Sequence, residues 1–285
     1  MHIPSLELLG QSLLSGLFIG GLYGLLGLGL SLSWGMLRQI NLAHFALAFL
    51  GAYLTYQLSE HFKLDPFVTM VIIVPGFFLI GMAMHWVFAR FKVTPFNSLL
   101  VTFGLAVIIE SLIQWIWSAD YRKLESSYSD VKFQVGQLFF PLPELMTLLI
   151  AIALSIATWA LLRYTALGKA MRAMSENPRM AAAFGINEPM LALVLSGAAS
   201  AFAGVAGACL ALSFTLAPSQ IYAWVGVVFS AVMIGGLGNP LGPLVAGIVI
   251  GLSEAATMAV TAPAWAPLVS FSLLIAVLLL RPGKV

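Results

Sequence analysis

The sequence contains little charge. Only 8% of its 285 residues are Asp, Glu, Lys or Arg, whereas about a quarter are charged in a typical soluble domain. Apolar residues make up 61% of the chain, and the mean hydropathy is +1.01. A soluble fold of this size cannot bury so much apolar surface without leaving large exposed patches. The composition therefore excludes a cytosolic enzyme, a nucleic-acid-binding protein and a disordered linker, and it indicates a polytopic membrane protein.

Cysteine and enzyme motifs are also scarce. The single cysteine, Cys209, lies in an apolar run and forms neither an internal disulfide nor a metal cluster. The sequence has no HExxH zinc motif, no GxSxG nucleophile motif and no Walker A motif. We therefore expect no catalytic residue, no metal and no cofactor on this chain, and any ATP hydrolysis is expected on other chains.

Long hydrophobic runs dominate the sequence instead. A helix needs about 20 apolar residues to cross a bilayer core. The hydrophobic runs over 43–58, 222–236 and 266–280 are short enough to be half-helices or re-entrant segments. We expect an all-α polytopic membrane protein with about 8–10 transmembrane or half-transmembrane helices, a possible inverted repeat and one transmembrane domain over 1–285. The nine candidate runs are 8–37, 43–58, 66–88, 98–118, 142–162, 190–212, 222–236, 242–262 and 266–280.

The distribution of basic residues predicts the orientation. Lys and Arg are enriched in cytoplasmic segments of membrane proteins. With the N-terminus outside and the C-terminus inside, nine of the 13 basic residues fall in inner segments and four in outer ones. Two loops are long, an outer one over 119–141 and an inner one over 163–188. The inner basic residues are Arg38, Arg90, Lys92, Arg163, Lys169, Arg172, Arg179, Arg281 and Lys284, and the outer ones are Lys63, Arg122, Lys123 and Lys132.

Small residues recur at helical spacing in three runs. Small side chains let membrane helices approach closely, so these stripes predict helix packing within the chain. The alternative is a subunit interface or a moving pore wall. The stripes are Ser12, Gly16, Gly20 and Gly24, then Ser196, Ser200, Gly204 and Ala208, and finally Gly247, Gly251 and Ala255.

Polar residues within or beside the apolar runs are few. Glu110 and Glu254 lie near the middle of two runs, and a carboxylate there faces a bundle interior or a pathway. Each acid is either a proton or cation site, or a hydrogen-bonding link between helices, and the absence of an intramembrane base slightly favours the link. The glycine-rich break over 235–242 is either part of a pathway or a plain cytoplasmic turn. The candidate pathway or intramembrane polar residues are Asn41, His44, Glu110, Gln114, Asn239 and Glu254.

His44 and Asn41 follow Arg38 at the inner boundary of the second run. A histidine at this place either lines a pathway or makes hydrogen bonds at the membrane interface. We favour the interfacial hydrogen bond.

The inner loop has the pattern of two short amphipathic helices. Asn177 can cap the second helix, Pro178 suits its first position, and Gly185 can end it. We expect Met171, Met174 and Phe184 to offer apolar anchors, and the basic residues to attract acidic partners. The loop is therefore either a docking element or an ordinary positively charged loop that rests on lipid headgroups.

Three stretches, in order, resemble the permease subunits of Liv-type branched-chain amino acid ABC importers. The first runs from 21 to 53, the second is the inner loop, and the third runs from 235 to 255, so the resemblance covers nearly the whole chain. In the first stretch the family typically has Asn-Phe-Ala-His-Gly. This chain has Leu42 and Phe45 at the Phe and final Gly positions, which makes a non-standard substrate conceivable.

The resemblance implies a permease subunit in the bacterial inner membrane that forms half of a translocation pathway. The implied partners are a second permease, which is a related or identical chain, two cytoplasmic ABC ATPases and a periplasmic substrate-binding protein. The implied solute is small, polar and organic, with amino acids favoured. The lipid bilayer surrounds the chain, and no nucleic acid is involved. The implied ATPase-coupling residues are Gly168, Lys169, Arg172, Glu176, Asn177, Pro178, Arg179, Phe184 and Gly185.

Two other classes of function remain open at this point. One is a proton- or ion-coupled secondary transporter that uses Glu110 or Glu254. The other is a scaffolding membrane subunit without a pathway of its own. Neither accounts for the inner loop as well as an ATPase partner does.

Overall fold

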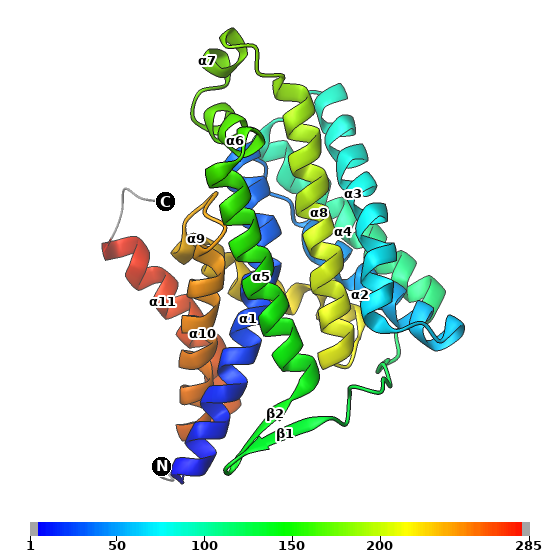
Figure 1. The fold of residues 1–285 in the computed structure, drawn as a ribbon, viewed down its shortest axis with the longest axis vertical. Helices are drawn as coiled ribbons and strands as arrows, with labels where there is room; N and C mark the ends of the chain where they lie inside the picture. The colour runs from blue at the N-terminus through cyan, green and yellow to red at the C-terminus, as the bar shows by residue number, and fades with distance from the viewer. Residues whose placement is uncertain (1–4, 281–285) are drawn as a thin grey trace.

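A computed structural model describes residues 5–280, which form a helical bundle with one short β-hairpin (Figure 1). Eight helical segments in this part of the chain are long and apolar enough to cross a membrane. They confirm an all-α polytopic membrane protein. The elements are α1 (Leu6–Leu37), α2 (Ala43–Phe62), α3 (Pro66–Arg90), α4 (Pro95–Trp117), β1 (Lys132–Val135), β2 (Leu138–Pro141), α5 (Leu142–Tyr164), α6 (Ala166–Glu176), α7 (Pro178–Ala183), α8 (Glu188–Ser213), the 3-10 helix η1 (Pro218–Trp224), α9 (Val225–Gly235), α10 (Gly242–Val260), the 3-10 helix η2 (Pro263–Trp265) and α11 (Ala266–Leu280).

The three short runs have different outcomes. Two of them are lengthened by a preceding 3-10 helix, and the combined segments over 218–235 and 263–280 are among the eight apolar spans. The third run forms α2, which has 20 residues but is not among those spans. Its outer half carries polar residues, including Gln57, Glu60 and His61, which lower its hydropathy.

Side-chain caps define where several helices begin. A cap accepts a hydrogen bond from a free backbone N–H, and a proline in the first turn loses no helical hydrogen bond. Proline also fixes the backbone in a helical φ, so each cap–proline pair sets the start of its helix. The capping side chains with a proline in the following turn are Asp65, Thr94, Asn177 and Asn187.

The two long loops lie at opposite ends of the bundle (Figure 1). The start of α1 and the β-hairpin are at one end, and α6 and α7 are at the other. Contacts between loops agree with this division. The Tyr128 hydroxyl in the outer loop donates to Asp65, and Arg38 donates to the Ser175 carbonyl oxygen at the other end. The segments predicted for one side of the membrane therefore meet one another. The basic residues Arg281 and Lys284, used in the orientation, lie outside the described residues.

The helices follow the order of an inverted repeat. α1 and α8 are the most buried spans, and they run in opposite directions through the bundle (Figure 1). α1 is followed by a short non-helical segment and the shorter helix α2, and α8 is followed by a short non-helical segment and then η1 with α9. Two further helices complete each half, α3 and α4 in the first and α10 and α11 in the second. α10 packs along α1, and α3 packs along α8, so each half covers the central helix of the other.

Small residues allow this close packing between the halves. A β-carbon at Gly20 would lie 2.6 Å from the Gly247 carbonyl oxygen, so α1 and α10 touch backbone to backbone. In the other pair, Ser196 Oγ donates to the Gly81 carbonyl oxygen at 2.9 Å. The prediction that the small-residue stripes pack helices within the chain is confirmed.

Candidate functional site

The inner loop folds back onto the end of α5. Thr165 caps α6 by accepting a hydrogen bond from the Gly168 amide at 3.0 Å. A β-carbon at Gly168 would overlap the backbone of Leu161 and Leu162, so only glycine allows α6 to turn this sharply. The position of α6 is therefore set by the close contact of Gly168 with the backbone of α5.

The second helix of the loop forms as its sequence predicts. Asn177 Oδ1 accepts a hydrogen bond from the Met180 amide at 3.2 Å, and Pro178 begins α7. α7 ends at Ala183, and Gly185 follows with a φ of +82°, in the left-handed region that favours glycine. The predicted cap, first-turn proline and terminating glycine are thus confirmed.

Two of the three expected apolar anchors are not available to a partner. Met171 and Met174 are buried in a cluster with Leu28 and Leu32 of α1, because the apolar face of α6 turns toward the bundle. Phe184 is 82% exposed. The prediction that both methionines serve as surface anchors is wrong, and Phe184 alone retains that position.

The outer face of α6 and α7 carries unpaired charge beside an apolar groove. The charged side chains Lys169, Arg172, Glu176 and Arg179 are exposed. Within the described residues the one salt bridge joins Lys63 to Glu60, so none of these four is paired. A groove of about 560 Å³ runs between α6 and α7. Its lining is Ala166, Lys169, Ala170, Ala173, Glu176, Asn177, Met180, Ala181, Phe184 and Ile186.

His44 lies deeper than its place in the sequence indicated. The segment 38–42 runs back into the bundle, where the Leu42 amide donates to Thr102 Oγ1 at 3.0 Å. The His44 ring is 1% exposed, and its Nε2 lies 2.9 Å from the Leu26 carbonyl oxygen. Leu26 is about 16 Å from the inner end of α1 at 1.5 Å per residue. The boundary position predicted for His44 is therefore wrong, because the short non-helical segment 38–42 returns the chain to the bundle before α2 begins. Asn41 Oδ1 is buried without a hydrogen-bond partner.

Glu254 joins three helices. The Tyr23 hydroxyl of α1 donates to one carboxylate oxygen at 2.9 Å, and the Ser270 hydroxyl of α11 donates to the other at 2.6 Å. Glu254 itself lies on α10 and is 6% exposed. Both carboxylate oxygens therefore have a donor from a different helix, which is the geometry of a polar link between helices.

The glycine-rich break is a tight turn held against α1. The Gly238 amide lies 3.1 Å from both the carbonyl oxygen and Oγ of Ser31. The exposed Asn239 side chain accepts a hydrogen bond from the Leu241 amide at 3.2 Å. The predicted helix break is confirmed, and Asn239 stabilises the start of α10.

Glu110 differs from Glu254 in its exposure. It lies on α4, is partly exposed, and accepts a hydrogen bond from Gln114 Nε2 at 3.2 Å. The structure therefore places the two intramembrane acids in different surroundings and does not bring them together.

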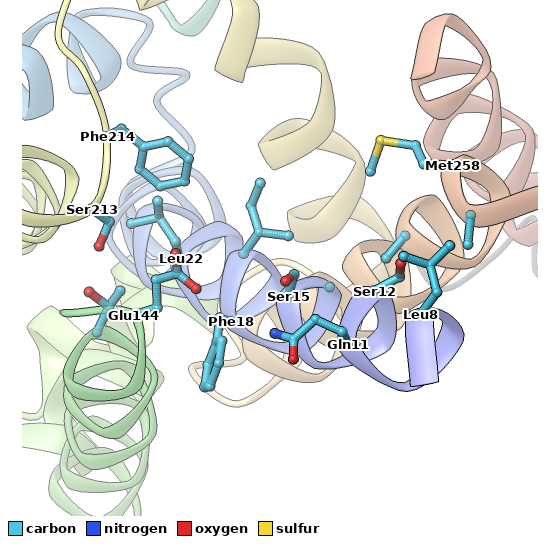
Figure 2. Close-up of a pocket in the computed structure, with 15 residues that line it drawn as sticks. Leu8, Gln11, Ser12, Ser15, Phe18, Leu22, Glu144, Ser213, Phe214 and Met258 are labelled. Atoms are coloured by element: carbon cyan, nitrogen blue, oxygen red, sulfur yellow. The ribbon is translucent and has the colours of Figure 1, made fainter. Parts of the chain in front are cut away.

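A cavity that the sequence did not indicate lies at the outer end of α1. Its volume is about 460 Å³, and Figure 2 shows Glu144 and Ser213 on one side of α1 and Met258 on the other. Gln11 joins α1 to the β-hairpin, donating to the Phe139 carbonyl oxygen at 3.0 Å and accepting from the Phe139 amide at 2.9 Å. No spacing motif marks Gln11 or Glu144, because the cavity forms only where four separate helices meet.

The described part of the chain holds no group of three or more His, Cys, Asp or Glu side chains that could bind a metal ion. The prediction that the chain carries no cofactor stays a prediction.

The described chain thus combines eight candidate membrane spans with an exposed inner loop. Residues 12–278 match the family model for the permease component of branched-chain amino acid transport systems, and the chain belongs to this family. It is therefore a permease of the ABC importer class and not an enzyme. The match supports the importer hypothesis and not the secondary transporter.

Several curated relatives cover most of the chain. The permease protein LivH of the high-affinity branched-chain amino acid transport system of Escherichia coli K12 is 26% identical, over 95% of this chain and 93% of the relative. The corresponding permease protein BraD of Pseudomonas aeruginosa is 24% identical, over 95% and 94%. A probable branched-chain amino acid transport permease LivH of Methanocaldococcus jannaschii is 28% identical, over 90% and 86%. No solved structure matches the chain.

Proposed function

We propose that this chain is the membrane-spanning subunit of an importer for branched-chain or related amino acids in the bacterial inner membrane. Permeases of this type work with ABC ATPases and a substrate-binding protein. In the proposed complex the chain pairs with a second permease, either a related chain or a second copy, and the pathway runs between them. Two cytoplasmic ATPases bind the inner loops, and a periplasmic binding protein delivers the solute. Residues 1–285 act as one transmembrane permease domain.

The observation that carries this proposal is the exposed face of the α6–α7 loop. Phe184, Arg172 and Arg179 project from the pair of short helices without partners in the described chain. An aromatic residue beside unpaired arginines is typical of the centre of a protein interface. Such a surface suits a cytoplasmic protein partner better than lipid headgroups, because Phe184 lies beside the apolar groove between the helices.

Two groups of residues in the inner loop have separate roles in this proposal. Asn177 and Pro178 set the turn between α6 and α7, Gly185 ends α7, and Gly168 holds α6 against α5. The remaining residues contact the ATPases. A movement of the ATPases then reaches α5 through α6, and the importer changes state because the ATPases bind its two states with different free energies. The contact residues in this proposal are Lys169, Arg172, Glu176, Arg179 and Phe184.

Four of the candidate polar residues are proposed to act structurally. Glu254 links three helices, His44 links α2 to α1, and Asn239 supports the start of α10. Their hydrogen bonds are made within the chain, which leaves them little capacity to bind a solute. The Asn41 backbone carbonyl oxygen accepts a hydrogen bond from the His44 amide and supports the turn into α2.

The test of the coupling loop reverses its charge. We expect an Arg172→Glu/Arg179→Glu variant to lose at least fivefold in copurification of the ATPases and in ATP-dependent leucine uptake. Gly185→Asp should also uncouple transport, because aspartate fits poorly at a positive φ and adds a negative charge. Membrane insertion should be normal in both. Lys123→Glu, a reversal in the outer loop, is the matched control and should leave ATPase binding unchanged. Unchanged uptake and copurification in the double variant and in Gly185→Asp would contradict the assignment.

A further inference from the structure

α4 has a polar stripe on a face that this chain does not cover. Glu110 is partly exposed, and Gln114 is exposed one turn further along the same face. The packed side of α4 lies elsewhere on the helix, and the large residues on the opposite side, such as Ile108 and Leu112, are exposed apolar side chains. The helix thus has one side packed in the chain, one apolar side and a polar stripe between them.

The stripe is unsuited to contact with lipid. An acidic side chain at the centre of a membrane helix costs about 2.5–3.5 kcal/mol on insertion scales. Glu110 is about 10 Å from the outer end of α4 at 1.5 Å per residue, and its charge therefore lies below the headgroup level. Gln114 adds a second polar group that hydrocarbon cannot hydrogen-bond. This face of α4 must therefore meet water or polar groups in the assembled importer.

The surroundings of Glu110 form a chemically distinct site. Gln114 Nε2 donates to its carboxylate at 3.2 Å, and Phe103 lies two turns before Glu110 on the same face of α4. Tyr222 of η1 packs against Phe103, with ring centroids 6.3 Å apart, and both rings are partly exposed. The site therefore combines one acid, one neutral donor and two aromatic surfaces.

No base within the described residues neutralises this acid, because the one salt bridge there is between Lys63 and Glu60. The Gln114 amide orients the carboxylate but leaves its charge uncompensated. The complementary occupant is a cation attached to an apolar body, since a cation also binds favourably over aromatic rings. An amino acid has an α-ammonium group beside a side chain that can lie on the two rings.

We propose that Glu110, Gln114 and Tyr222 line the outer half of the translocation pathway, where Glu110 binds the α-ammonium group of the transported amino acid. This assignment rests on the proposed function, and it adds the group of the solute that this chain recognises. Phe103 and Tyr222 provide the surface for the apolar side chain. The second permease faces this stripe across the pathway.

The first arm of the test measures access to the stripe. The only native cysteine, Cys209, is fully buried, so an introduced cysteine is the reactive one. We expect Gln114→Cys in the assembled importer to react with a membrane-impermeant cationic methanethiosulfonate, added from outside, at least tenfold faster than Leu112→Cys. Leu112 is the matched control, because it lies at similar depth on the opposite side of α4. Loaded binding protein with ATP should slow the reaction of Gln114→Cys. Equal rates for the two variants would overturn the proposal.

The second arm measures transport in proteoliposomes that hold the complete importer. Glu110→Gln keeps the shape and the hydrogen-bond acceptor but removes the charge, and it should lower leucine uptake at saturating loaded binding protein at least tenfold. Glu110→Asp keeps the charge and should lose less than threefold. ATPase activity should persist in both, which shows that the complex is assembled. Wild-type importer without ATP-dependent leucine uptake would refute the proposed function. Normal wild-type uptake together with full uptake by Glu110→Gln would refute the present inference alone.

Discussion

Replacing Gly20 by alanine should weaken the contact between the two halves of the bundle. The added β-carbon would lie 2.6 Å from both the Gly247 carbonyl oxygen and the Ile248 Cα. These are backbone atoms, so the clash is relieved only by moving α1 and α10 apart. Overpacking of this kind costs about 1–3 kcal/mol. Alanine also favours helix over glycine by about 1 kcal/mol, and this gain opposes the clash.

Gly76 provides the matched control, because a β-carbon there meets nothing within 4 Å. Gly76→Ala gains helix propensity without a clash. The difference between the two variants therefore isolates the clash, and its size should be about 1–3 kcal/mol. At roughly 2–4 °C per kcal/mol for a chain of this size, the melting temperature of Gly20→Ala should lie about 2–12 °C below that of Gly76→Ala. Tryptophan fluorescence of the purified permease in mild detergent measures both transitions.

A second substitution checks the cause. A β-carbon at Gly247 would lie 2.6 Å from the Gly20 carbonyl oxygen, so its clash is relieved by the same helix separation. The Gly20→Ala/Gly247→Ala double variant should therefore lose less stability than the sum of the single losses. Equal melting temperatures for Gly20→Ala and Gly76→Ala would show that the helices are not packed this closely, and the reasoning would fail.

Two further predictions concern polar links. Glu254→Ala leaves the hydroxyls of Tyr23 and Ser270 without their acceptor, and it should lower stability by about 1–3 kcal/mol for each hydroxyl. Glu254→Gln keeps an acceptor and should retain substantial uptake. Complete loss of uptake in a normally assembled Glu254→Gln importer would contradict the structural role. In the outer loop, the hydrogen bond to Asp65 raises the pKa of Tyr128 above its ordinary value near 10. The stabilisation of the outer loop by this hydrogen bond is therefore fully present below pH 10 and is lost as the pH rises through the higher folded-state pKa of Tyr128. Proteolysis of the loop should accelerate in that pH range. Tyr128→Phe should remove this dependence on pH.

Much of the local structure was predictable because it depends on neighbouring residues. Asn177, Pro178 and Gly185 act within one turn of chain, so their pattern predicts α7 and its two ends. The break before α10 follows in the same way from three glycines and a proline. The small-residue stripes predicted helix packing, although only the structure shows that α10 lies along α1 and α3 along α8.

The positions that sequence reasoning missed depend on contacts between distant segments. Met171 and Met174 look like anchors on an isolated amphipathic helix, but α6 turns them onto α1 because Gly168 allows a close approach to α5. His44 follows a basic residue, yet the non-helical segment 38–42 carries it into the bundle beside Leu26. Periodicity describes a face of a helix and does not identify what covers it.

The sequence by itself determined that this protein lies in a membrane, where its helices begin and end, and to which family of permeases it belongs. These properties follow from composition, short-range capping chemistry and ordered motifs. The tertiary structure decided the different surroundings of the two acids. Glu254 is enclosed by hydroxyls from two other helices, whereas Glu110 lies on a face that the chain leaves open. Both acids occupy similar places in apolar runs, and only the packing of distant helices determines which of them is buried.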